Sequence, residues 1–278
     1  MSAQIEVFLN GGVGNQLFGL AAGQALALKL QLPLTLNISN LEHRSFQLNN
    51  LKISNCTIST KADLVYNIHN PIAKKMYINL FLRHGNLFEK SFQFDHRFNS
   101  IALPTRLHGY FQSYKYFLNY EQEIKQTILN PINSSSEYQR FVSTIDFSNS
   151  IAIHLRRGDY LEKISFHGIA DETYYRNAIG ITRSQLGEKK FFVFTDDLIE
   201  ARRFFPDAEQ IITERELPRP MDNILLMSHF SAIIGANSSF SYWSGILSGS
   251  RLKIFPRNWF ANSNIDTRDL LPEDFIRI

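Results

Sequence analysis

Short apolar runs alternate with longer segments of helical periodicity through the second half of the chain. The apolar runs are rich in Ile, Val and Phe and predict strands at residues 151–155, 191–195, 210–213, 231–236 and 251–255. The segments between them predict helices at residues 171–186, 198–205, 220–230 and 239–248. Strands that alternate with helices in this way favour right-handed crossovers and a parallel sheet.

The first half opens with the same alternation and then becomes less regular. Its opening predicts a strand, a glycine-rich turn, a long helix and a second strand at residues 4–10, 11–14, 15–32 and 33–38. Weaker signals predict strands at 55–60 and 106–112 and helices at 71–83, 114–129 and 136–145. The polar run 130–137 is the candidate linker. We therefore predict an α/β protein whose two halves, residues 1–148 and 149–278, face each other across a cleft.

Composition and charge narrow the class of protein. The 278 residues carry a formal net charge of +3 without a run of Lys and Arg, which argues against a nucleic-acid partner. The small positive excess fits an anionic small molecule or an anionic membrane surface equally well. Cys56 is the single cysteine, so a reducing compartment is the natural interpretation. Because no apolar stretch approaches the ~20 residues that span a bilayer, and the N-terminus lacks a signal-peptide pattern, we expect a cytoplasmic protein, at most peripheral at the inner membrane.

The sequence HLRRGDY (154–160) concentrates hydrogen-bond donors at the end of a predicted strand. Side chains alternate along a strand, so His154 and Arg156 share one face while Arg157 lies on the other. The carboxyl ends of parallel strands are where α/β sheets bind ligands, and a guanidinium fork matches two phosphate oxygens. The alternative is a pair of surface arginines with a local Arg–Asp ion pair. Taken alone, the motif leaves both interpretations open; if it binds an anion, the alternation along the strand directs Arg156 at the ligand.

Two further strand ends in the same predicted sheet carry polar side chains. FFVFTDD ends in Asp196 and Asp197, where a carboxylate could accept the N1 and N2 hydrogens of guanine. The alternatives are a helix N-cap and a metal-binding acidic pair, although the chain contains no Asp-x-Asp motif. GANSSFSYWSG places Asn237, Ser238 and Ser239 at a helix start, where they form an anion site or simply cap the helix.

A glycine-rich turn, GGVG (11–14), follows the first predicted strand and precedes a long helix. A phosphate often meets a helix N-terminus at such a turn. The dinucleotide motif G-x-G-x-x-G requires glycine at the position of Leu17, so a nicotinamide-dependent oxidoreductase is disfavoured. Asn15 and Gln16 place two amides at the helix start, where they could face a cleft; the alternative is a tight turn without a ligand.

Together these motifs resemble the bacterial α-1,2-fucosyltransferases, the family that includes the blood-group H enzymes. The resemblance rests on GGVGNQLF, GYFQSYKYF, HLRRGDY, FFVFTDD and DNILLMSHFSAIIGANSSFSYWSG, and it runs in order from residue 11 to about residue 255. It implies a GT-B-like fold of two Rossmann-like domains that face each other across a cleft, with the acceptor side in residues 1–148 and the GDP-fucose site in residues 149–278. It also implies inverting transfer of L-fucose from GDP-β-L-fucose to O2 of a galactose in an oligosaccharide or lipid-linked glycan, for surface-polysaccharide (O-antigen) synthesis. No cofactor and no obligatory metal would be needed.

The resemblance implies roles for individual residues. Arg156 would contact the donor diphosphate and act in catalysis, His154 would lie beside the nucleotide, and Asp196 would read guanine. Two serines of the last motif would contact phosphate, and an asparagine of the glycine loop would lie near the fucose. The full set of donor-binding residues is Gly14, Asn15, Gln16, His154, Arg156, Asp196, Asn237, Ser238, Ser239 and Phe240.

The catalytic base stays open at this point. Asp159 is predicted to act in catalysis together with Arg156, and Glu162 is a second carboxylate nearby. Two alternatives to the whole function also stay open. One is a fucosyltransferase of another linkage on the same scaffold, and the other is a non-catalytic module that binds a sugar nucleotide or a glycan.

Overall fold

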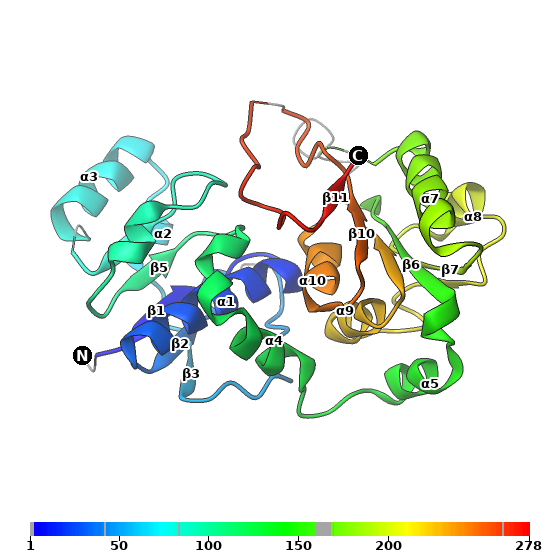
Figure 1. Cartoon of the computed structure of the whole chain (residues 1–278). Helices are drawn as coiled ribbons and strands as arrows, with labels where there is room; N and C mark the ends of the chain where they lie inside the picture. Colours follow the sequence, from blue (N-terminus) through cyan, green and yellow to red (C-terminus); the bar gives the residue numbers. More distant parts are fainter. Residues whose placement is uncertain (1–2, 42, 83, 159–167, 169, 263) are drawn as a thin grey trace. The chain divides into compact units, whose positions relative to one another are not determined.

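Two parallel β-sheets form the framework of the chain (Figure 1). The computed structural model describes residues 3–41, 43–82, 84–158, 168, 170–262 and 264–278. The contacts between residues divide the chain into two units, residues 1–131 with 268–270 and residues 132–267 with 271–278. The second unit thus begins before residue 149, where the second domain was predicted to start. The reason is that α5 (Ser136–Thr144) packs through Phe141 into the same core as α9 (Pro220–Ser228).

The first unit is built on a five-stranded sheet in the order β3-β2-β1-β5-β4, in which all paired strands are parallel. Its strands are β1 (Ile5–Phe8), β2 (Leu34–Asn37), β3 (Cys56–Ser59), β4 (Asn86–Phe88) and β5 (Arg106–His108). Its helices are α1 (Val13–Leu30), α2 (Leu64–Asn67), α3 (Pro71–Phe81) and α4 (Glu121–Leu129), with the short turns η1 (His96–Ser100), η2 (Tyr114–Tyr116) and η3 (Leu118–Tyr120). β2 and β3 lie on one side of the central strand β1, and after β3 the chain passes to the other side of β1 to form β4 and β5. The carboxyl ends of β1 and β5 therefore flank a topological switch point.

Helix α1 covers one face of this sheet because it presents small residues to the strands. A Cβ on Gly23 would lie 2.9 Å from both Val7 Cγ1 and Leu34 Cδ1, so a larger residue there would push the helix away from the sheet. The helix begins at Val13, two residues earlier than predicted. Gly14 therefore lies in the first turn of α1 and not in the turn that precedes it.

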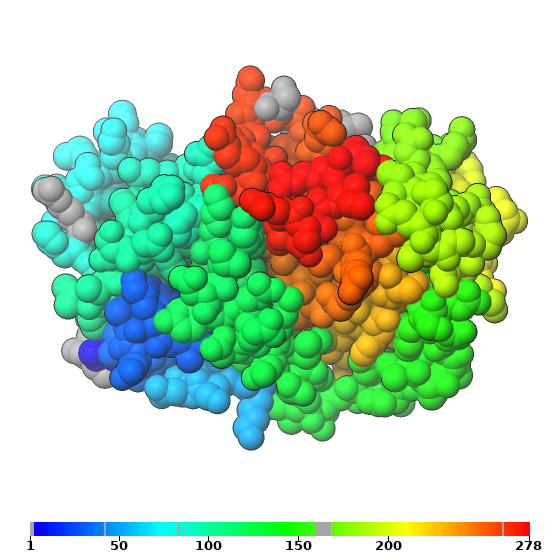
Figure 2. Space-filling model, viewed as in Figure 1, coloured from blue at the N-terminus to red at the C-terminus, as the bar shows by residue number. Residues whose placement is uncertain are grey.

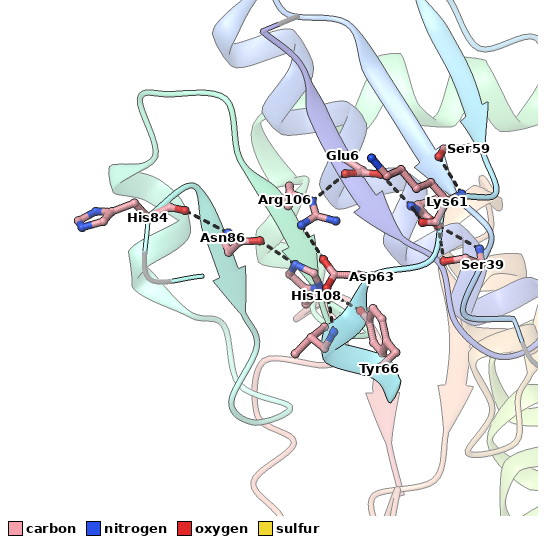
Figure 3. A network of polar contacts seen from close by, with 12 residues as sticks. Glu6, Ser39, Ser59, Lys61, Asp63, Tyr66, His84, Asn86, Arg106 and His108 are labelled. Atoms are coloured by element: carbon pink, nitrogen blue, oxygen red, sulfur yellow. Dashed lines mark hydrogen bonds and ion pairs between the residues drawn. The ribbon is translucent and has the colours of Figure 1, made fainter. Parts of the chain in front are cut away.

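The opposite face of the first sheet carries a polar network (Figure 3). Arg106 on β5 forms ion pairs with Glu6 on β1 (Nε to Oε2, 2.8 Å) and with Asp63 (Nη1 to Oδ2, 2.6 Å). Asp63 also caps α2, because its Oδ1 accepts the backbone N–H of Val65 at 2.9 Å. These contacts tie α2 to the sheet through charged groups.

His108 continues this network. Its ring stacks on Phe8 and Phe88, with centroids 4.6 and 4.2 Å away, and burial together with the charge of Arg106 in the network lowers its pKa to about 3. Nε2 lies 3.0 Å from Oδ1 of Asn86, and Nδ1 lies 3.0 Å from the hydroxyl of Tyr66. An amide oxygen only accepts, so Nε2 carries the proton and Tyr66 donates to Nδ1. A neutral histidine thus makes a second polar link between α2 and the sheet.

The second unit is built on a six-stranded sheet in the order β11-β10-β9-β6-β7-β8, again with all paired strands parallel. Its strands are β6 (Ser150–Leu155), β7 (Lys190–Thr195), β8 (Gln210–Ile212), β9 (Ala232–Ile234), β10 (Leu252–Phe255) and β11 (Ile276–Arg277). Its helices, besides α5 and α9, are α7 (Glu172–Leu186), α8 (Leu198–Phe204) and α10 (Ser239–Leu247), with the turn η4 (Phe147–Asn149). With its first strand in the centre, this is the doubly wound Rossmann order, and the switch point lies between β6 and β9.

Strand β6 is buried on both of its faces. Ile151, Ile153 and Leu155 pack with α7 and α8, while Ala152 packs with α5 and α9 on the other side. A continuous apolar run is what a central strand of a parallel sheet requires, since helices cover both faces (Figure 1).

The predicted architecture of parallel sheets with crossover helices is confirmed, and some details of the prediction are wrong or incomplete. The short strands β4 and β11 and the short helix α2 were not predicted. The predicted helix 114–129 is α-helical only from Glu121, because the turns η2 and η3 precede it. Across the described part of the chain, no helix combines the length and the apolar character needed to cross a membrane.

Candidate active site

The carboxyl edge of the second sheet gathers the polar residues that follow β9, β6 and β7. These three strands are direct neighbours, so the strand ends that were predicted to lie in one sheet are adjacent. The residues that follow them include Asn237, Arg156 and Asp196. Because β6 and β9 flank the switch point, this edge is the candidate active site of the second unit.

Arg156 and Asp196 form an ion pair at this edge. Nη1 of Arg156 lies 2.7 Å from Oδ2 of Asp196, and the two side chains are 28% and 26% exposed. The second carboxylate oxygen, Oδ1, accepts the backbone N–H of Arg157 at 2.9 Å. Asp196 therefore orients both the guanidinium of Arg156 and the backbone that follows β6, while solvent still reaches both side chains.

Arg157 and His154 lie on opposite faces of the sheet, as the alternation along β6 predicts. Arg157 is buried, and its guanidinium carbon lies 5.0 Å from the ring centroid of Phe204 on α8. The ring of His154 instead lies 5.3 Å from that of Phe240 on α10. A buried cation against an aromatic ring contributes to packing and to cation–π attraction. Arg157 therefore anchors the end of β6 to α8.

His154 is a buried, neutral histidine next to a cation. Burial, and after it the charge of Arg156, lowers the pKa of His154 to about 3. Its Nδ1 has no hydrogen-bond partner among the described residues. A buried polar atom without a partner costs free energy, which a bound ligand or a water molecule would recover. At neutral pH the positive charge at this strand end comes from arginine, and His154 offers an uncharged ring nitrogen beside it.

The start of α10 adds backbone N–H groups to the same edge. Ser238 is the N-cap, and its Oγ accepts the N–H of Phe240 at 3.3 Å. Ser238 is buried and Ser239 is partly exposed. No acidic residue lies in the first turn, so the positive end of the helix dipole is available to an anion.

Asn237 uses its side-chain NH2 group within the protein, and its contact with a donor stays a prediction. Its Nδ2 donates to the carbonyl oxygen of Trp259 at 3.0 Å and to that of Gly168. Both amide hydrogens are thus used to join the end of β9 to two loops.

The predicted donor-binding residues of the glycine loop belong to the first unit and form a group of their own. Gln16 is fully buried, and its Nε2 donates to the carbonyl oxygens of Gly11 and Ser45, both at 3.0 Å. Asn15 accepts a hydrogen bond from Gln112 at 2.7 Å. The first turn of α1 has neither a side-chain cap nor an acidic residue, so its N–H groups suit an anion. Gln16 holds the loop, whereas Asn15 lies at its partly exposed rim.

Residues 4–273 of the chain, nearly its whole length, match a protein-family model. This match decides the family to which the chain belongs. The model is described as "Glycosyl transferase family 11". The chain belongs to this family. The resemblance that the motifs indicated is thereby confirmed at the level of the family.

Two curated relatives in Escherichia coli match along almost their whole length. An α-1,2-colitosyltransferase is 28% identical, with 97% of each chain covered. The O-antigen biosynthesis glycosyltransferase WbnK is also 28% identical, over 92% of this chain and 95% of WbnK. The NodZ α-1,6-fucosyltransferase of Bradyrhizobium, solved after soaking with GDP-fucose, superposes with a TM-score of 0.52 at 14% identity, covering 88% of this chain and 93% of NodZ. The likeness to NodZ shows that this family 11 protein has a GT-B-type fold.

The acidic candidates of this family 11 protein divide into two groups. Asp159 and Glu162 lie outside the described residues, so their roles stay predictions. Asp197 is the N-cap of α8, because its Oδ1 accepts the N–H groups of Ile199 and Glu200 at 3.1 and 3.0 Å. Within the described residues, no group of three or more His, Cys, Asp and Glu side chains could hold a metal ion.

Glu89, which sequence reasoning did not single out, lies at the carboxyl edge of the first sheet. It follows β4, and its Oε2 accepts the N–H groups of Tyr110 and Phe111 at 2.8 and 2.9 Å. Burial raises the pKa of Glu89 to about 7, against the lowering effect of these N–H groups. A Cβ on Gly109 would lie 2.5 Å from the Cβ of Glu89, which explains the glycine. The carboxyl group braces the loop after β5, at the switch point of the first sheet.

Proposed function

We propose that this family 11 glycosyltransferase moves L-fucose from GDP-β-L-fucose to O2 of a galactose residue in a surface glycan, with inversion at the anomeric carbon. The observation that carries the proposal is Arg156, held by Asp196 at the switch point of a Rossmann-ordered sheet. His154 Nδ1 and the N-terminus of α10 lie at the same sheet edge and complete a set of groups suited to a nucleoside diphosphate. The first unit would then supply the acceptor side.

The chemistry requires positive groups at the leaving diphosphate. As O2 of the acceptor bonds to C1 of fucose, the bond from C1 to the β-phosphate oxygen breaks, and GDP leaves with an additional negative charge. Fixed donors that meet this charge lower the barrier without an obligatory metal ion, and removal of one such donor costs about 10²–10³ in rate. The proton of the acceptor hydroxyl passes to a base, a role we propose for Asp159.

A second donor is favoured by one specific observation, the match to the α-1,2-colitosyltransferase over 97% of both chains. Colitose is the 3-deoxy analogue of L-fucose. Hydrogen bonds to the 3-hydroxyl of the sugar would therefore separate the two donors, since a site built to bind a hydroxyl discriminates strongly against the analogue that lacks it.

The test is incubation of the purified protein with GDP-fucose or GDP-colitose and a panel of β-galactosides in excess EDTA, followed by linkage analysis. We expect fucosyl transfer to O2 of galactose, with GDP released. Transfer to another hydroxyl would contradict the linkage, and faster transfer from GDP-colitose would contradict the donor. Loss of activity in EDTA that Mn²⁺ restores would contradict metal independence. Binding of GDP-fucose without release of GDP in the presence of any acceptor would indicate a binding module.

We expect Asp196→Asn to weaken GDP binding at least about tenfold, because asparagine is uncharged and replaces one of the two acceptor oxygens with an NH2 group, which cannot accept a hydrogen bond from guanine. The rate at saturating donor should fall as well, because the ion pair that orients Arg156 is weakened by the same substitution. Calorimetry with GDP and IDP measures the contact between Asp196 and the base, because hypoxanthine, the base of IDP, lacks the 2-amino group. The wild type should bind GDP more tightly than IDP, and this difference in affinity should be smaller in the variant. Asp197→Asn is the matched control, because asparagine also caps a helix. Unchanged GDP affinity with a lower kcat would instead assign Asp196 to positioning Arg156.

A further inference from the structure

Helix α3 presents an apolar stripe to solvent. Ile72, Met76 and Leu80 are 71%, 57% and 70% exposed, and their spacing of four residues places them on one face of the helix. Leu64 on α2 (64%) and Phe81 at the end of α3 (71%) add to the exposed apolar surface. Figure 2 shows this cyan part of the chain at the molecular surface. Isolated exposed hydrophobic residues are common, whereas a stripe along one helix marks an interaction surface.

The attachment of this segment to the first unit explains why its apolar side faces outward. No residue of α3 is buried. The preceding α2 is held to the sheet by the polar network, through the Asp63–Arg106 ion pair and the Tyr66–His108 hydrogen bond (Figure 3). Lys74 of α3 in turn lies 5.7 Å from the ring centroid of Tyr66. The less exposed side of α3 consists of Lys74, Tyr77 and Ile78, and the stripe of Ile72, Met76 and Leu80 on the other side has no described residue covering it.

The charge of this segment selects the kind of partner. Residues 64–88 contain Lys74, Lys75 and Arg83 and neither Asp nor Glu. The acidic residues that flank this range in the sequence are Asp63, which pairs with Arg106 at 2.6 Å, and Glu89, whose carboxyl group accepts backbone N–H groups of the loop after β5. Apolar side chains next to lysines, without acidic residues, match the acyl boundary and headgroups of an anionic bilayer.

A protein partner fits this surface less well. A stable protein interface buries about 800 Å² on each partner and involves roughly 20–30 residues a side. Helix α3 has 11 residues, of which four apolar side chains are strongly exposed. Such a helix is too small for a stable protein interface, while interfacial membrane binding needs only one apolar face with basic neighbours.

We propose that residues 64–82 form a membrane-docking element that inserts Ile72, Met76 and Leu80 into the interface of an anionic bilayer, with the exposed Lys75 at the headgroups. The proposal rests on α2 and α3 alone and does not depend on the donor or the acceptor. It would bring the acceptor side of the enzyme to a glycan carried on that membrane.

The test is flotation of the full-length protein with vesicles of phosphatidylcholine alone or mixed with phosphatidylglycerol. The wild type should bind the anionic vesicles, and less so as salt is raised. Met76→Asp should lower the partition coefficient at least about tenfold, because a charge then replaces the centre of the inserted stripe. Lys75→Glu should lower it by about threefold or more through repulsion from the headgroups.

Ile199→Asp on α8 is the matched control, since Ile199 is 81% exposed and lies in the second unit. It should bind vesicles as the wild type does. Leu80→Asp repeats the measurement if the melting temperature of Met76→Asp shows a folding defect.

No binding of vesicles by the wild type, or an equal loss of binding in Ile199→Asp, would overturn the proposal. A concentration-dependent dimer that Met76→Asp dissociates would replace the membrane with a second copy. Transfer to a soluble acceptor should be unchanged in these variants, so failure here and failure of the proposed function are distinguishable.

Discussion

Arg156→Lys is expected to lower kcat by at least about 100-fold, the cost of losing one fixed donor to a developing anion. Lysine keeps the charge and loses the planar fork that binds two oxygens at once. It also loses the defined geometry of the ion pair between Nη1 and Asp196 Oδ2, which is 2.7 Å in this structure. The interaction strengthens as charge develops on the leaving diphosphate, so the loss should fall on kcat at saturating GDP-fucose.

Arg157→Lys is the matched comparison, because the two arginines are adjacent and differ in surroundings. Arg157 is buried and lies over Phe204, so its replacement should lower the melting temperature and leave kcat within a fewfold of the wild type. Steady-state kinetics and thermal unfolding of both purified variants measure the contrast. An inactive Arg157→Lys beside an active Arg156→Lys would mean that the residues exchange roles, and the proposed phosphate contact would be wrong.

The polar edge of the second sheet was predictable because its residues follow long apolar strands. β6 and β7 have six residues each, and this length is enough to fix the strand, its end and the alternation of its side chains. β4 has three residues, too few for a period to show, and Glu89 directly follows it. The contacts of Glu89 with the loop after β5 therefore could not be predicted from the sequence.

The roles of single amides were not predictable, because they depend on partners far along the chain. Gln16 donates to Ser45, 29 residues away, and Asn237 donates to Gly168, 69 residues away. In the sequence, Gln16 lies two residues after Gly14 and Asn237 directly precedes Ser238, each near the start of a helix. At such a position an amide could equally contact a ligand or the protein backbone. Only the fold shows that the Nδ2 group of Asn237 and the Nε2 group of Gln16 are engaged by the backbone.

Gly158→Ala is expected to lower kcat/KM for GDP-fucose on the order of 100-fold, since misplacing a reacting group by about 1 Å has this effect. A Cβ at position 158 would lie 2.4 Å from Oδ2 of Asp196, the atom that pairs with Arg156. The carboxylate must move, and the guanidinium loses its orientation. Because Gly158 is exposed, the melting temperature should change little.

Gly180→Ala is the control for this prediction. Gly180 lies in α7, and a Cβ at this position would have no neighbouring atom within 4 Å, so alanine should keep activity and add about 0.5–1 kcal/mol of helix stability. Kinetics on Gly158→Ala, Asp196→Asn and the double variant show whether alanine at position 158 lowers activity by displacing the Asp196 carboxylate. If it does, the double variant should be little worse than the poorer single variant, because the same interaction is removed twice. Full additivity, or wild-type activity in Gly158→Ala, would mean that the Arg156–Asp196 pair does not set the position of the arginine during catalysis.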